Sequence, residues 1–168
     1  MQKLTTKKIA KTGVIAAVYA CLCLITLPIS SGAIQIRISE ALTLLPLIMP
    51  ESIIALFVGC IIANLITGCV ILDVIFGSMV TLLASVFTYL IGRLIKNKFL
   101  KIGLGGLFPV LLNAFLLPVI WYFAYGKLEY LYIVQVGFLL IGQTASVYLF
   151  GSVFYLGTEK FLSNKKIG

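Results

Sequence analysis

The stretch that most constrains the fold runs from residue 37 to residue 73 and reads RISEALTLLPLIMPESIIALFVGCIIANLITGCVILD. Its apolar runs are too long and continuous for a soluble domain, yet ionisable side chains interrupt them. Ionisable residues at membrane depth are costly and usually functional. Pro46 and Pro50 divide the stretch into a short and a long piece. Because interrupted helices in transporters often border a cavity, we predict a solute site here.

Composition extends this interpretation to the whole chain. Of 168 residues, 61% are hydrophobic and 11% are charged, whereas soluble domains average about 25% charged residues. We therefore predict one transmembrane domain over residues 1–168, in the cell membrane. The net charge of +8 comes from basic clusters between apolar runs, which is typical of cytoplasmic loops, so we do not expect nucleic-acid binding.

Six apolar segments predict an all-α fold, an integral membrane bundle of six transmembrane helices. They cover about residues 12–30, 38–49, 51–67, 73–95, 104–124 and 129–159. The second segment is short and is expected to be a tilted or partial helix. The glycines of KIGLGG, before the fifth segment, are expected to form a flexible turn.

Basic residues predict the orientation. With the N-terminus inside, six spans return the C-terminus inside, and the basic clusters at 3–11, 93–101 and 160–166 all face the cytoplasm. A five-span arrangement would place the C-terminal lysines outside. We therefore favour six spans with both termini cytoplasmic, and expect the loop at 31–37 outside.

Polar residues from several spans then converge near or below the outer face. Carboxylates accept hydrogen bonds from N–H groups, carboxamides match donor–acceptor edges, and aromatic rings stack on flat solutes. This combination predicts an outward cavity for a planar, nitrogen-rich solute that can carry a positive charge. The candidate substrate-binding residues are Arg37, Glu40, Asn64, Asp73, Asn113, Trp121 and Gln143.

Structural roles remain open for the same residues. Trp121 can belong to an interfacial aromatic belt, and Asn113 and Gln143 can form hydrogen bonds between helices. Arg37, Glu40 and Asp73 can form a structural ion network. Glu51, in contrast, is expected to complement a helix dipole rather than to bind substrate.

Ala16 and Ala20 lie four residues apart in the first segment, on one helix face. Small residues at this spacing let a second helix approach closely in lipid. The second helix can belong to a partner protein or to the same bundle.

No catalytic motif is present in the sequence. It contains no His and no G-x-x-x-x-G-K-[ST] phosphate loop, and its four Cys residues lie in apolar runs without His beside them. We therefore expect no enzyme activity, no metal site and no cofactor.

Three segments carry a resemblance to a known family: IQIRISEALTLLPLIMPESI, GCIIANLITG and LDVIFGSMVTLLAS. They resemble the substrate-binding S components of energy-coupling factor transporters, in particular the queuosine-precursor group called QueT. The resemblance implies capture of a 7-deazaguanine base from outside, together with a membrane T component and two cytoplasmic ATPases that use ATP. It also implies that small residues of the first helix contact the T component, which favours Ala16 and Ala20 as a partner interface.

Two other functions remain open. One is an S component for a different vitamin or heterocycle. The other is a stand-alone secondary carrier driven by an ion through Glu40 or Asp73. For an S component of either specificity, we expect the loop at 31–37 and the short segment after it to close over the solute. A cross-link at Ser31 would test this closure.

Overall fold

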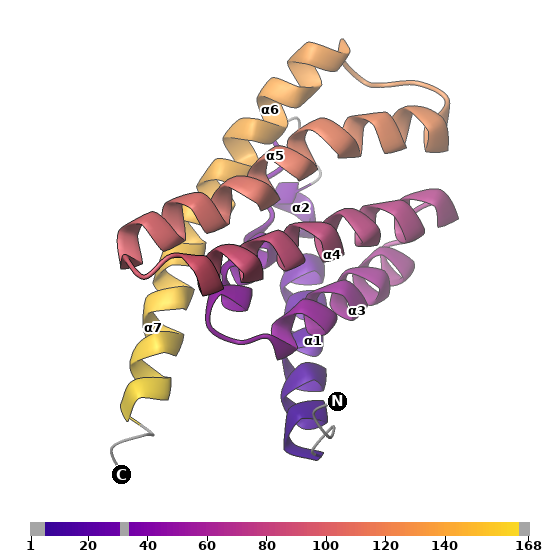
Figure 1. Ribbon diagram of the computed structural model, residues 1–168. Coiled ribbons are helices and arrows are strands. Elements are labelled where there is room, and N and C mark those ends of the chain that lie inside the picture. Colours follow the sequence, from indigo (N-terminus) through magenta and orange to yellow (C-terminus); the bar gives the residue numbers. More distant parts are fainter. Residues whose placement is uncertain (1–5, 31–33, 165–168) are drawn as a thin grey trace.

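The computed structural model describes residues 6–30 and 34–164 (Figure 1), so residues 31–33 of the expected loop, including Ser31, lie outside the described residues. The described chain is helical and contains no strand. Its elements are α1 (Thr6–Ile25), α2 (Leu27–Ser30), the 3₁₀ helix η1 (Ile38–Leu47), α3 (Glu51–Ile66), α4 (Ile71–Leu94), α5 (Lys98–Tyr125), α6 (Tyr132–Thr144), the π-helical η2 (Ala145–Phe150) and α7 (Gly151–Asn164). The all-helical prediction is confirmed.

Four helical segments are long and apolar enough to cross a membrane: Thr6–Ile25, Ile71–Leu94, Lys98–Tyr125 and Tyr132–Asn164. Two shorter apolar helices, Ile38–Leu47 and Glu51–Ile66, complete the bundle. Large apolar side chains cover its outer surface, among them Val14, Ile54, Met79, Phe115 and Val153. An apolar exterior of this kind suits lipid rather than water, so the chain is a multi-pass membrane protein.

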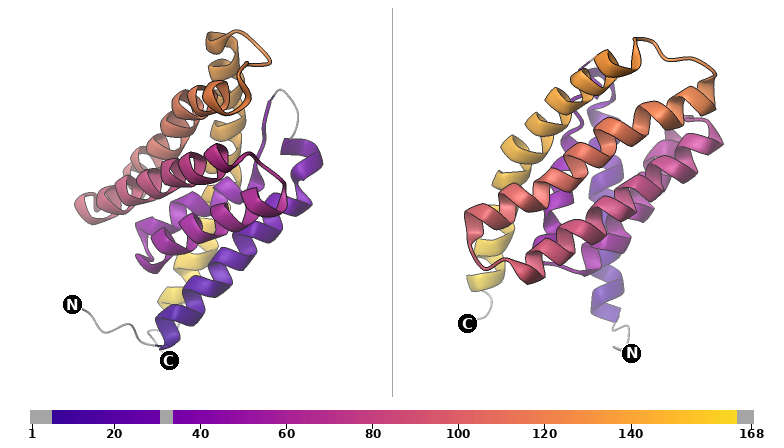
Figure 2. Two further views of the ribbon diagram at one scale, coloured as in Figure 1. Left: turned by 90° about the vertical axis from the view of Figure 1, so that its right-hand side faces the viewer. Right: turned by 45° about the horizontal axis from the view of Figure 1, so that its top comes forward.

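The six segments alternate in direction. The ends of α1, α3 and α5 meet the starts of η1, α4 and α6 around one cavity. The starts of α1 and α3 meet the ends of η1 and α7 at the opposite end, where an ion pair joins Lys98 to Glu159. The start of α1 and the end of α7 therefore share one end of the bundle (Figures 1 and 2).

The helix η1 forms the centre of the bundle, and its residues from Ser39 to Leu47 are all buried. Helices pack unusually close to it. A Cβ atom at Gly92 of α4 would lie 2.7 Å from the carbonyl oxygen of Leu47, and one at Gly105 of α5 would lie 2.7 Å from Leu47 Cδ2. Glycine at these positions therefore lets α4 and α5 reach the centre.

The glycines of KIGLGG are helical, which corrects the prediction of a flexible turn. The helix α5 begins at Lys98 because the side chain of Asn97 accepts hydrogen bonds from the backbone N–H groups of Phe99 (3.0 Å) and Leu100 (3.3 Å). Gly105 then packs on η1 as described above. Close packing, not a turn, explains this glycine.

Ala16 and Ala20 lie inside the bundle, with exposed fractions of 4% and 5%. Gly59 of α3 packs directly on Ala16, since a Cβ atom at Gly59 would lie 2.8 Å from the Ala16 carbonyl oxygen. The prediction that these two alanines face a partner is thus corrected: their face packs within the chain, which is the alternative that the sequence left open. The exposed small residues of α1 include Ala10, Gly13, Ala17 and Cys21 instead.

Candidate functional site

A cavity of about 630 Å³ opens at the end of the bundle opposite the α7 terminus. Its walls come from α1, α2, residues 35–39, the end of α3, the start of α4, the end of α5 and the start of α6. Four of the seven predicted substrate-binding residues line it: Arg37, Asn64, Asp73 and Trp121. They belong to four different parts of the chain, and only the alternating bundle brings them together.

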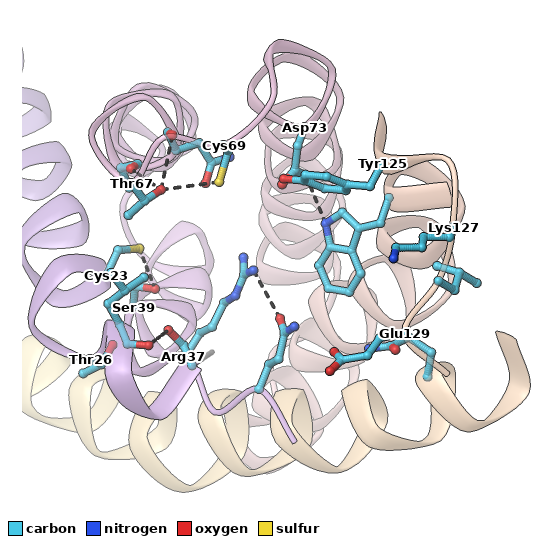
Figure 3. Close-up of a pocket in the computed structure, with 18 residues that line it drawn as sticks. Cys23, Thr26, Arg37, Ser39, Thr67, Cys69, Asp73, Tyr125, Lys127 and Glu129 are labelled. Atoms are coloured by element: carbon cyan, nitrogen blue, oxygen red, sulfur yellow. Dashed lines mark hydrogen bonds between the residues drawn. The ribbon is translucent and has the colours of Figure 1, made fainter. Parts of the chain in front are cut away.

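Asp73 lies on one wall of the cavity (Figure 3), and Trp121 lines the cavity beside it. Trp121 Nε1 donates a hydrogen bond to Asp73 Oδ1 at 3.3 Å, and Asp73 is only 6% exposed. Asp73 lies in the first turn of α4, where the helix dipole favours a negative charge. Asp73 lines the cavity, so its carboxylate can accept a hydrogen bond from a ligand N–H group.

Arg37 approaches the cavity from the connection before η1, and its guanidinium donates to Gln35 Oε1 at 3.2 Å. Desolvation disfavours its positive charge, but nearby acidic groups, Glu40 foremost, outweigh this effect and raise the pKa of Arg37 above its usual value. Arg37 is therefore a fixed positive charge beside the negative Asp73 wall.

Charges of both signs line the cavity without pairing with one another. Arg37, Asp73, Lys127 and Glu129 all contribute to its lining. None of these four forms an ion pair within 4.0 Å with another described residue, whereas Lys98 and Glu159 do so at the other end of the molecule. The cavity thus offers hydrogen-bond donors and acceptors that a polar ligand can engage on both sides.

The wall opposite Asp73 is small and neutral (Figure 3). Cys23 Sγ donates to Ser39 Oγ at 3.0 Å, and Thr67 Oγ1 donates to the Ala63 carbonyl oxygen at 2.9 Å. Cys69 also lines the cavity. Sequence reasoning missed these residues, because hydroxyl and thiol groups within apolar helices carry no signal of which face they occupy.

Glu40, Asn113 and Gln143 do not line the cavity but form a buried network among the helices. Glu40 accepts hydrogen bonds from Tyr19 Oη (2.8 Å) and from Asn113 Nδ2 (3.2 Å). Asn113 Nδ2 also donates to Gln143 Oε1 at 3.2 Å. The geometry therefore corresponds to the structural alternative, hydrogen bonding between helices, rather than to direct substrate contact.

Other cavity residues were also missed, notably Gln135, Gln35 and Tyr125. Gln135 carried the clearest available signal, because it is a polar residue two turns before Gln143 in an apolar helix. Glu51 lies in the first turn of α3, which is its expected place beside a helix dipole, and this turn is at the end of the bundle opposite the cavity. Among the described residues, no group of three or more His, Cys, Asp or Glu side chains could hold a metal ion.

Comparison with known proteins adds one match. No curated protein and no solved structure matches this chain. The family model described as QueT transporter, in contrast, matches residues 9–160, a range that includes every residue of the cavity. The chain therefore belongs to the QueT transporter family.

Proposed function

We propose that this membrane protein is the substrate-binding S component of an energy-coupling factor transporter and captures a queuosine precursor from outside the cell. The precursor is a 7-deazaguanine base with an aminomethyl or a cyano side group. A membrane T component and two cytoplasmic ATPases then drive its delivery inward. Family membership supports the transporter assignment, and the observation that carries the substrate is the cavity lined by unpaired charges of both signs.

The chemistry of a 7-deazaguanine suits this cavity. Its ring N1–H and exocyclic amino group form a row of donors, which a carboxylate such as Asp73 can accept in a bidentate manner. Its ring carbonyl can accept from Arg37. Trp121 and Tyr125, both on the cavity wall, offer aromatic faces for the flat ring. The remaining carboxylate, Glu129, can accept from the ammonium group of the aminomethyl form.

The proposed topology has six crossings, both termini in the cytoplasm and the cavity outside. Basic residues support it, because the lysines at the start of α1, Lys98 and Lys160 lie at the end of the bundle opposite the cavity. The 3₁₀ helix η1 has ten residues and, at about 2.0 Å per residue, is about 20 Å long. The α-helix α3 has sixteen residues and, at about 1.5 Å per residue, is about 24 Å long. Both are shorter than the ~30 Å hydrocarbon core, which suggests that the bilayer thins beside them.

The T component would contact the exposed small-residue face of α1. Gly13, Ala17 and Cys21 follow one another at four-residue intervals and face outward, and a Cβ atom at Gly13 would meet nothing within 4 Å. Such a face lets a partner helix approach closely in lipid. This face replaces Ala16 and Ala20 in the proposal.

A fluorescence titration tests the substrate. Trp121 is the single tryptophan of the chain and lies on the cavity wall, so a ligand that enters should change its emission. We expect a response to 7-aminomethyl- or 7-cyano-7-deazaguanine but not to common vitamins, and we expect Asp73→Asn to weaken it. Glu51→Gln, a carboxylate change at the far end of the bundle, is the matched control. A response to another heterocycle alone would identify an S component of different specificity.

A second candidate function is a stand-alone carrier driven by an ion. It is favoured by one observation: the Glu40 carboxylate is 2% exposed and lies in the centre of the bundle, where ionisable groups often serve ion coupling. Reconstitution of the purified chain in liposomes separates the two functions. The carrier predicts uptake that depends on pH or sodium, whereas the S component predicts no net uptake without the T component and ATPases.

A further inference from the structure

Gln135 differs from the other buried polar residues of the cavity in having no partner. It is 3% exposed and lies in the first turn of α6. Its backbone N–H bonds to the Leu131 carbonyl oxygen at 3.0 Å, but its side-chain amide makes no hydrogen bond to any residue that the structure describes. Arg37 and Asp73, by comparison, are each held by a neighbouring side chain. The amide lines the cavity and has no partner in the described chain, so it is available to hydrogen-bond a ligand there.

The amide also specifies what the ligand must offer. A carboxamide places an acceptor oxygen beside a donor NH₂ group, so its complement is an edge with one donor and one acceptor side by side. Asp73 offers acceptor oxygens alone when ionised and suits an edge with two donors. A 7-deazaguanine carries both edges on one flat ring: N1–H and the exocyclic amino group form the donor edge, and the pyrrole N9–H and N3 form the mixed edge.

We infer that Gln135 is the residue that reads the N9–H and N3 edge of the bound base and so selects a free base over its nucleoside. This inference rests on the proposed function. The amide oxygen accepts from N9–H and the amide NH₂ donates to N3. A substituent on N9, such as the ribose of a nucleoside, removes that donor and leaves the buried amide oxygen of Gln135 unpaired.

The test compares two ligands and two proteins by titration of Trp121 fluorescence. The ligands are 7-aminomethyl-7-deazaguanine and its 9-methyl derivative; the proteins are the wild type and Gln135→Leu. The wild type is expected to bind the 9-methyl compound about tenfold or more weakly, the effect of an unpaired buried polar group. Gln135→Leu is expected to bind the parent base about as weakly as the wild type binds the 9-methyl compound, and to discriminate little between the two.

The outcomes of this titration separate failure of the inference from failure of the proposed function. Equal binding of both compounds by the wild type, or unchanged discrimination in Gln135→Leu, overturns the role of Gln135 and leaves the substrate proposal standing. Binding of neither compound by the wild type overturns the substrate proposal and the inference with it.

Thermal unfolding of the ligand-free variants separates a recognition role from a structural one. Gln135→Leu removes an amide without a partner in the described chain and is expected to unfold at the wild-type temperature or above it. Asn113→Leu, in the central network, removes the donor of the bonds to Glu40 and Gln143 and is expected to unfold at a lower temperature. An equal loss in both variants, or failure of Gln135→Leu to accumulate, overturns the inference. Gln135→Glu keeps the shape and the acceptor but cannot donate to N3 when ionised, so it should weaken binding of the parent base, and unchanged binding would again refute the assignment.

Discussion

Replacement of Gly59 by alanine tests the contact that joins α1 to α3. A Cβ atom at this position would lie 2.8 Å from the Ala16 carbonyl oxygen and 3.0 Å from Tyr19 Cβ. Neither atom is the tip of a flexible side chain, so the two helices must move apart. The movement would also displace Tyr19, whose hydroxyl group donates to Glu40 in the central network.

The expected magnitude combines two opposing effects. Overpacking of a close contact typically costs about 1–3 kcal/mol, and alanine in a helix interior is favoured over glycine by about 1 kcal/mol. Since the nearest atoms belong to backbone and Cβ, the cost should lie in the upper part of its range. We therefore expect Gly59→Ala to reduce the free energy of unfolding by about 1–2 kcal/mol.

Gly103 of α5 provides the matched control, because a Cβ atom there would meet nothing within 4 Å. Gly103→Ala should therefore keep only the favourable helix effect and raise stability by up to about 1 kcal/mol. Unfolding of both variants in detergent, followed by heat or denaturant, measures the difference. Equal stability of the two variants would refute the reasoning that α1 and α3 are held together at Gly59.

Three further predictions concern other parts of the chain. Glu40→Gln should lower the free energy of unfolding by about 1–3 kcal/mol, because one donor from Tyr19 or Asn113 then faces an NH₂ group. Its ligand affinity, measured by Trp121 titration, should fall less than that of Asp73→Asn. The reverse order would contradict the structural role of Glu40. Ala17→Leu, on the exposed face of α1, should reduce co-purification with the T component while changing stability by less than about 0.5 kcal/mol; undiminished co-purification would exclude this face. Lys98→Met should lower the free energy of unfolding by less than about 1 kcal/mol, since both partners of its ion pair are partly exposed. A loss of stability that does not shrink in high salt would argue against a surface ion pair.

Some of the candidate site could be predicted from the sequence. Arg37, Asn64, Asp73 and Trp121 were predicted to meet because each lies near the end of an apolar segment, and alternation of direction gathers every second end of a bundle on one side. The cavity confirms that they meet. Their contact with substrate remains a prediction, and so does the six-span count, because four of the segments reach spanning length.

Depth and facing were harder to predict than position along a helix. The sequence placed Glu40, Asn113 and Gln143 at helical positions but could not tell the cavity wall from the interior, since both are polar surroundings enclosed by apolar helices. Ala16 and Ala17 are neighbours in sequence, yet one is buried and the other exposed. A turn of about 100° per residue separates the two faces, and hydrophobicity does not distinguish them in a chain that contacts lipid on one face and protein on the other.

The sequence by itself determined that the chain is a helical membrane protein, because its apolar runs have no alternative environment and a backbone in lipid must satisfy its hydrogen bonds within helices. Only the tertiary structure decided which polar groups meet. It joined Glu40 to Tyr19, Asn113 and Gln143, and left Gln135 without a partner on the cavity wall. The physical reason is that these contacts depend on how helices rotate and approach, which close glycine contacts such as those at Gly59 and Gly92 control.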